Sequence, residues 1–493
     1  MYLGIDIGTS AVKALIVDEE GRALSQSQAP LTVSRPHPLW SEQEPTQWWE
    51  ATRQAVTSLH SNLRSAVRAV GLSGQMHGAT LLDDHDRPLR PSILWNDGRS
   101  EAECRELESR APKSRTVTGN VAMPGFTAPK LLWVQRHEPE LFRRIARVFL
   151  PKDYVRLCMT GEYATDASDA SGTLLLDVAH RNWSAAMLAA TGLNENQMPQ
   201  VLEGTELSGT LRAEVAAEWG MAEGVVVAAG GGDNAAGAIG VGVIDSGQAF
   251  LSLGTSGVIF AADDQFRPNP ERATHVFCHC VPDRWHEMSV TLSAAACVDW
   301  VAKLVGYPNV KTALTEAERS HERSSTEIFL PYLSGERTPH NDPHALGVFF
   351  GLTHDTDPAA VVRAVLEGVA FALADGVDAL KEAGVDLHRL SVIGGGSRSM
   401  YWGRLLAAAL QLPLDYHSGA DLSPAYGAAR LARLALNQES HNQVCTPPPI
   451  FRTLEPDPVL VESLASKRVI FRELYSQLSA VFLKNHLQVL ARV

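Results

Sequence analysis

Two stretches decide the fold, YLGIDIGTSAVKALIV at residues 2–17 and AFLSLGTSGVIFAA at residues 249–262. Each has an apolar run, a Gly-Thr-Ser turn and a second apolar run, a pattern typical of a β-hairpin. The turns begin at Gly8 and Gly254, so the copies lie about half of the chain apart. A repeat this long does not indicate a solenoid. It predicts two domains of like topology, each opening with the same hairpin.

The length of 493 residues favours two large domains or three smaller ones, because one hydrophobic core rarely grows that large. We place the N-terminal domain at 1–244 and the C-terminal domain at 245–493. The run Thr446-Pro-Pro-Pro449 interrupts the second domain. After it, from about residue 455, we expect a helical tail, with a helix over about 459–486 that packs back on the body.

Strand and helix patterns alternate between these landmarks. Residues 69–73 and 390–393 are short apolar runs, and helical patterns begin near residues 46, 399 and 424. Such alternation predicts an α/β fold with mostly parallel or mixed sheets covered by helices.

Composition excludes several classes of protein. A net charge of −13 argues against a broad nucleic-acid-binding surface. No apolar run reaches the ~18 residues of a membrane span, and the first residues do not form a signal peptide. Six cysteines without a framework spacing suit a reduced cytoplasm. We therefore expect a cytoplasmic protein that binds neither nucleic acid nor membrane.

The stretch AAGGGDNAAGA at residues 228–238 places Asp233 after three glycines, at a strand-to-helix corner. The simplest interpretation is a capping residue, since Asp is common at the start of helices. A second corner, Gly394-Gly395-Gly396, follows the strand at 390–393. Glycine lets a ligand approach backbone N–H groups closely. Two hairpins and two such corners predict a cleft that holds a polyphosphate, although no Walker A sequence occurs.

Several further segments bear on the identity of this site. In chain order they are WSEQEPTQWW (40–49), GQMHGATLLD (74–83), ILWNDGR (93–99), MPGFTAPKLLWVQ (123–135), LPKDY (150–154), GGGDNAAGA (230–238), LSLGTSG (251–257) and LPYLSGERTPH (330–340). Together they resemble the FGGY carbohydrate kinases, within the actin-like, ribonuclease-H-like ATPase superfamily. The resemblance covers residues 1 to about 435. It implies two actin-like domains of duplicated topology with an interdomain cleft, ATP and Mg²⁺ as cofactors, and a possible homodimer.

The resemblance also implies roles for single residues. Asp233 matches the general base that takes a proton from a sugar hydroxyl, and Asp6 matches the carboxylate that positions magnesium. The residues that match the sugar pocket are Met76, His77, Asn96, Asp97 and Asn234. Those that match the nucleotide site are Gly8, Thr9, Ser10, Gly254, Thr255, Ser256, Gly394 and Gly395. The segments GQMHG and WNDGR look most like those of members that phosphorylate D-xylulose.

Alternatives exist for the substrate, for the class of protein and for the roles of single residues. The substrate could be another ketose or polyol, namely ribulose, fuculose, gluconate or glycerol. A non-enzymatic actin-like ATP switch is a remote alternative, since a fold alone does not assign a function. Asp6 could be a turn residue, and Asn96 and Asp97 could form an Asx turn.

Two other groups of residues are expected to have structural roles. The cluster from His275 to His286 reads as a hairpin around a Pro-Asp turn, because its Cys and His spacings do not match a zinc site. Lys152, Arg99 and Arg337 are expected to anchor loops, since none occupies a Walker position.

Overall fold

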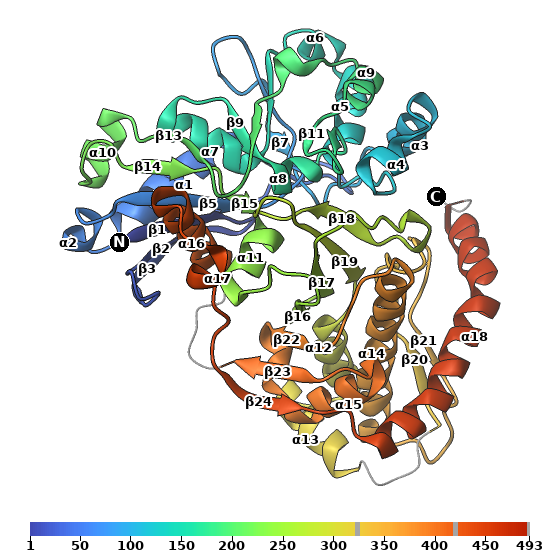
Figure 1. Cartoon of the computed structure of the whole chain (residues 1–493). Helices are drawn as coiled ribbons and strands as arrows, with labels where there is room; N and C mark the ends of the chain where they lie inside the picture. Colours follow the sequence, from blue (N-terminus) through green and yellow to red (C-terminus); the bar gives the residue numbers. More distant parts are fainter. Residues whose placement is uncertain (321–325, 418–422, 491–493) are drawn as a thin grey trace.

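The computed structural model describes residues 1–320, 326–417 and 423–490. It has two lobes, each built around a seven-stranded sheet, and the N-terminal half of the chain forms most of the upper lobe in Figure 1. The predicted α/β fold with two related lobes is confirmed.

The first sheet contains the first Gly-Thr-Ser hairpin. Strand β1 pairs antiparallel with β2 and parallel with β5. The sheet order is β13 (Leu207–Thr210), β14 (Val226–Ala228), β5 (Ala69–Gly74), β1 (Tyr2–Ile7), β2 (Ala11–Val17) and β3 (Ala23–Pro30), and the short β15 (Gly231–Gly232) also pairs with β5.

The second sheet repeats this arrangement. Strand β16 pairs antiparallel with β17 and parallel with β22, as β1 does with β2 and β5. The order is β18 (His275–Cys278), β19 (Trp285–Thr291), β17 (Gly257–Asp263), β16 (Ala249–Leu253), β22 (Leu390–Ile393), β23 (Leu414–His417) and β24 (Ile450–Leu454). The corner at Gly394 is therefore equivalent to the end of β5, whereas the glycines before Asp233 follow a different strand.

Alternation along β16 and β17 divides the second sheet into two apolar faces, because successive side chains point to opposite sides. Leu251 and Ile259 belong to the core of the second lobe together with helix α14 (Pro358–Glu382). Phe250 and Phe260 point the other way and share a core with residues of the first lobe, such as Leu131. The second face thus packs against the first lobe.

Helices cover both faces of the first sheet (Figure 1). Helices α1 (Pro45–Thr57) and α7 (Pro151–Thr160) contact one side. Helices α11 (Asp233–Val241) and α16 (Pro424–Asn437) pack against each other on this sheet. Gly4 and Gly71 make this approach possible, because a Cβ at either position would overlap the backbone of α16. Helix α16 therefore packs on the first sheet although it lies within the 245–493 range.

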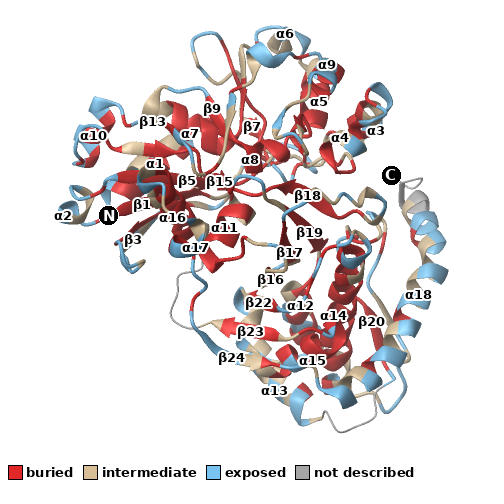
Figure 2. Ribbon diagram, viewed as in Figure 1, coloured by how far each residue is buried: buried red, intermediate tan, exposed pale blue. Residues whose placement is uncertain are grey.

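The last helix, α18 (Pro458–Leu490), runs along the outside of the second lobe (Figure 1). Most of its described residues are exposed or intermediate (Figure 2), and a few apolar side chains are buried against the lobe. Phe471 and Phe482 bury their rings in the lobe's core. Arg468 and Arg472 form ion pairs with Asp375 of α14. The expectation that the tail packs on the body is confirmed.

None of the helices in the described part of the chain combines the length and apolar character that crossing a membrane requires.

Candidate active site

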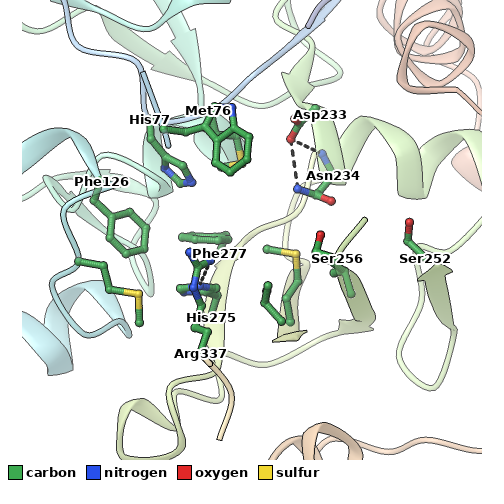
Figure 3. A pocket seen from close by; sticks show the side chains of 16 residues that line it. Met76, His77, Phe126, Asp233, Asn234, Ser252, Ser256, His275, Phe277 and Arg337 are labelled. Atoms are coloured by element: carbon green, nitrogen blue, oxygen red, sulfur yellow. Dashed lines mark hydrogen bonds between the residues drawn. The ribbon is translucent and has the colours of Figure 1, made fainter. Parts of the chain in front are cut away.

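A cavity of about 300 Å³ lies where the two lobes meet. Figure 3 shows Asp233 and Asn234 on one side of it, with His275, Phe277 and Arg337 of the second lobe across from them. The lining residues are Met76, His77, Trp95, Met123, Gly125, Phe126, Asp233, Asn234, Ser252, Ser256, Val258, His275, Phe277, Met288, Val290 and Arg337.

Asp233 is the first residue of helix α11 and faces this cavity. Its Oδ1 accepts hydrogen bonds from the backbone N–H and the side-chain amide of Asn234, at 2.7 and 3.2 Å. Burial, and to a smaller extent the charge of Asp6, raises the pKa of Asp233 to about 7. A carboxylate with a pKa near neutrality suits a general base.

The three glycines before Asp233 are required by close packing. Gly230 has a φ of +81°, and a Cβ there would overlap the backbone of Leu72 in β5. A Cβ on Gly231 would overlap Cys280, and one on Gly232 would lie 2.9 Å from Met76. Glycine therefore allows the corner to lie directly on β5 and its neighbours. The carboxylate is fixed at the cavity edge as a result.

His77 and Met76 line the cavity directly after β5. The Nδ1–H of His77 donates to the carbonyl oxygen of Gly172 at 2.6 Å, which leaves Nε2 as the nitrogen that can accept. Burial lowers the pKa of His77 to about 3, so the ring is neutral at pH 7. A neutral ring with one fixed acceptor suits a sugar hydroxyl.

Asn96 and Asp97 lie outside the cavity lining, although Trp95 before them belongs to it. Asn96 is exposed and lines a separate surface depression beside residues 35–41. Asp97 is buried and accepts hydrogen bonds from Arg99 and from the backbone N–H of Ser41. Asp97 thus fixes the loop that carries Trp95, and sugar contact by Asn96 or Asp97 stays a prediction.

The first hairpin lies behind Trp95. The Nε1–H of Trp95 donates to Thr9 Oγ1 at 3.0 Å, and this hydroxyl donates to Gln75 at 2.9 Å. Thr9 lies between Gly8 and Ser10 in the turn between β1 and β2. None of the three residues lines the cavity, so their role as a phosphate-binding turn stays a prediction.

Asp6, near the end of β1, is buried and accepts a hydrogen bond from Ser73 at 3.1 Å. Burial raises the pKa of Asp6 to about 6. The charge of the buried Asp6 acts on the half-buried Asp233 at this edge of the sheet, an arrangement that suits a nearby cation. The described residues contain no cluster of three or more metal-ligating side chains. Magnesium takes few carboxylates together with water and phosphate oxygens, and Asp6 would supply one such carboxylate.

A second cavity, of about 800 Å³, adjoins the second hairpin. Gly254 and Thr255 line it, whereas Ser256 lines the first cavity, so this hairpin borders both spaces. Gly395 also lines the larger cavity, and a Cβ on it would meet no atom within 4 Å. Gly394 is outside the lining, and its φ is +88°. The larger cavity is open, partly apolar and wide enough for a nucleotide.

Lys152 anchors the loops beneath the site, as expected. It is fully buried and forms ion pairs with Asp153, Asp166 and Asp169 at 2.7, 2.8 and 3.4 Å. Ser168 connects this cluster to the glycine corner before Asp233, because it donates to Asp166 and accepts the N–H of Gly232 at 3.1 Å.

Most of the residues by which the second lobe lines the cavity were not predicted from the sequence. His275 appeared only within the Cys and His cluster, which forms the expected hairpin β18–β19. Arg337 was expected to anchor a loop, but it lines the cavity. The alternation in HVF at residues 275–277 could have indicated that His275 and Phe277 share a face.

Comparison with known proteins decides the family. The model of the FGGY family of carbohydrate kinases matches with its N-terminal domain at residues 1–240 and its C-terminal domain at residues 249–436. The chain belongs to this family. Its members are kinases that use ATP and Mg²⁺, so the substrates of this enzyme are a sugar and ATP.

Individual relatives align over nearly the whole chain. The xylulose kinase of Escherichia coli (strain K12) is 56% identical over 97% of this chain and 99% of its own length. The xylulose kinase of Klebsiella pneumoniae is 53% identical with the same coverage. A crystal structure of a "xyloylose kinase" from Brucella ovis has 50% identity and a TM-score of 0.95, with 97% of this chain and 99% of that chain covered.

Proposed function

We propose that this enzyme transfers the γ-phosphoryl group of ATP to the terminal hydroxyl of D-xylulose, which gives D-xylulose 5-phosphate. The observation that carries the proposal is Asp233, a carboxylate with a raised pKa at the edge of a small cavity beside a nucleotide-sized one. Relatives with more than half of their residues identical over almost the full chain are named xylulose kinases, which supports this substrate.

In this proposal the sugar occupies the smaller cavity. Its terminal hydroxyl donates to Asp233, which takes the proton as the bond to phosphorus forms. Asn234 holds the other side of the carboxylate, so the proton-accepting oxygen has a fixed direction. The apolar walls, which include Met76 and Phe126, exclude water and so limit hydrolysis of ATP.

ATP occupies the larger cavity, with its terminal phosphate directed toward Ser256 at the border between the two spaces. The backbone N–H groups of the second hairpin offset the negative charge of the transferring group. Asp6 would hold magnesium together with phosphate oxygens, and the ion would supply positive charge that offsets the phosphate charge. The N-terminus of α11 adds a positive partial charge near Asp233.

An ADP-release assay with a panel of sugars tests the substrate. The panel contains D-xylulose, D-ribulose, L-fuculose, D-gluconate and glycerol. We expect D-xylulose to give the highest kcat/KM. Release that depends on another sugar alone would contradict the substrate, and release that ignores every sugar would contradict the kinase assignment. The homodimer and the cytoplasmic location also stay predictions, and light scattering of the purified protein tests the first.

A further inference from the structure

Arg337 is a cation in the sugar cavity that forms no ion pair with the described residues, although the charge of Glu336 acts on it. It follows Glu336 in the loop after strand β20 (Ile328–Leu330) and lines the space that Asp233 also lines. Within the part of the chain that the structure describes, no carboxylate forms an ion pair with its guanidinium group. The neighbouring Glu336 instead directs Oε1 to the backbone N–H groups of Leu292 and Arg337.

The hydrogen bonds of Asn120 determine which ring nitrogen of His275 carries the proton. The amide of Asn120 donates to the carbonyl oxygens of Thr118 and Val276, at 2.8 and 2.9 Å, so its Oδ1 must accept. That oxygen lies 2.9 Å from Nδ1 of His275, which is therefore the protonated nitrogen.

The remaining nitrogen of His275 determines the direction of Arg337. Burial holds the pKa of His275 well below its ordinary value, so the ring is neutral and its Nε2 is an acceptor. Arg337 donates to this nitrogen at 3.2 Å. His275 thus orients the guanidinium group without neutralising it. Because a guanidinium has five N–H donors, this leaves four that make no other hydrogen bond to the described residues.

Arg337 is half-buried, so its free donors lose part of their hydration without compensation, which is costly for an unpaired polar group. Burial also lowers the pKa of Arg337, although a guanidinium stays charged at neutral pH. Oxygen atoms of a ligand in the cavity would pair the donors. In Figure 3, Arg337 lies at the end of the cavity away from Asp233.

On this basis, and resting on the proposed function, we propose that Arg337 binds the sugar at the end opposite to the reacting hydroxyl. With the terminal hydroxyl at Asp233, the guanidinium donates to the C1 hydroxyl and C2 carbonyl oxygens of the ketose. Arg337 therefore fixes the direction of the sugar in the cavity and favours a polar C1 end.

The test compares wild type with Arg337→Met and Arg337→Lys. Titration calorimetry with D-xylulose should show binding weakened by about ten- to a hundred-fold in Arg337→Met, the range for a lost hydrogen bond to a charged group. Arg337→Lys should bind more tightly than Arg337→Met because it keeps the charge. The KM for ATP should change by less than about two-fold, which a general loss of structure would not allow.

Arg272→Met is the matched control. Arg272 lies in the same lobe and pairs with Glu382 at 2.9 Å, away from the cavity. It should leave sugar binding unchanged.

An analogue without the C1 hydroxyl, 1-deoxy-D-xylulose, completes a double-mutant cycle. Removal of this hydroxyl should weaken binding to wild type more than binding to Arg337→Met. Equal losses in both proteins, or unchanged D-xylulose binding in Arg337→Met, would overturn the inference. If wild type phosphorylates a different sugar of the panel, the proposed substrate fails, and the same comparison with that sugar still tests Arg337.

Discussion

Asp6 and Asp233 flank strand β5 from opposite sides. Asp6 lies in β1 opposite Ser73, and Asp233 follows β15, whose Gly231 also pairs with Ser73. Burial raises the pKa of both carboxyl groups, and the charge of Asp6 adds to the effect on Asp233. One strand therefore brings together the candidate magnesium ligand and the candidate base, from segments more than two hundred residues apart.

The raised pKa of Asp233 predicts how activity depends on pH. Only the ionised carboxylate accepts a proton, so kcat/KM for the sugar should fall about ten-fold per unit below about pH 7. The direction follows from the shift, because an ordinary Asp would stay ionised down to about pH 4. Steady-state kinetics between about pH 5 and about pH 9 check this. A profile that stays flat down to about pH 5 would contradict the environment assigned to Asp233.

Gly394 and Gly395 form a matched pair for the nucleotide site. Gly395→Ala adds a methyl group to open space that ATP should occupy, so the KM for ATP should rise about ten-fold with little loss of thermal stability. Gly394→Ala should instead destabilise the protein, because its φ is +88° and a Cβ would lie 2.7 Å from the carbonyl oxygen of Leu253. An unchanged KM for ATP in Gly395→Ala would contradict the nucleotide assignment.

The buried ion pairs of Lys152 predict a large loss of stability when this side chain is replaced. Lys152→Met removes the cation that three buried carboxylates share, which should lower the free energy of unfolding by about 3–5 kcal/mol. Denaturant unfolding measures this difference. Lys113→Met, at an exposed position, is the control and should change stability by less than about 0.5 kcal/mol. Equal effects of the two substitutions would show that the cluster does not stabilise the fold.

The strands were predictable because their sequences carry local signals. Strands β1, β2 and β22 begin and end where the apolar runs and Gly turns place them. The position of α16 was not predictable in this way. Helical periodicity indicates an apolar face but not the sheet that the face covers. The small residues at the contact, such as Gly71 in β5 and Gly427 in α16, are the sequence feature that indicates close packing of α16 against β5 and α11.

The sequence predicted cavity-lining residues of the first lobe but few of those of the second lobe. Asp233, Met76 and His77 stand in recognisable segments beside glycines, and the structure brings them to one cavity. Asn96 stands in an equally recognisable segment, but the turn after Trp95 directs it elsewhere. Arg337 lies in a loop whose path depends on long-range contacts with His275, which no local pattern reveals.

The most direct test of the central claim is single-turnover phosphoryl transfer in Asp233→Asn. The substitution keeps the size and polarity of the side chain but removes the base. With saturating MgATP and D-xylulose, we expect transfer to slow by about 10²–10⁴-fold while calorimetry gives sugar binding close to that of wild type. Transfer at a rate close to that of wild type would contradict the role of Asp233 and, with it, the mechanism proposed for this site.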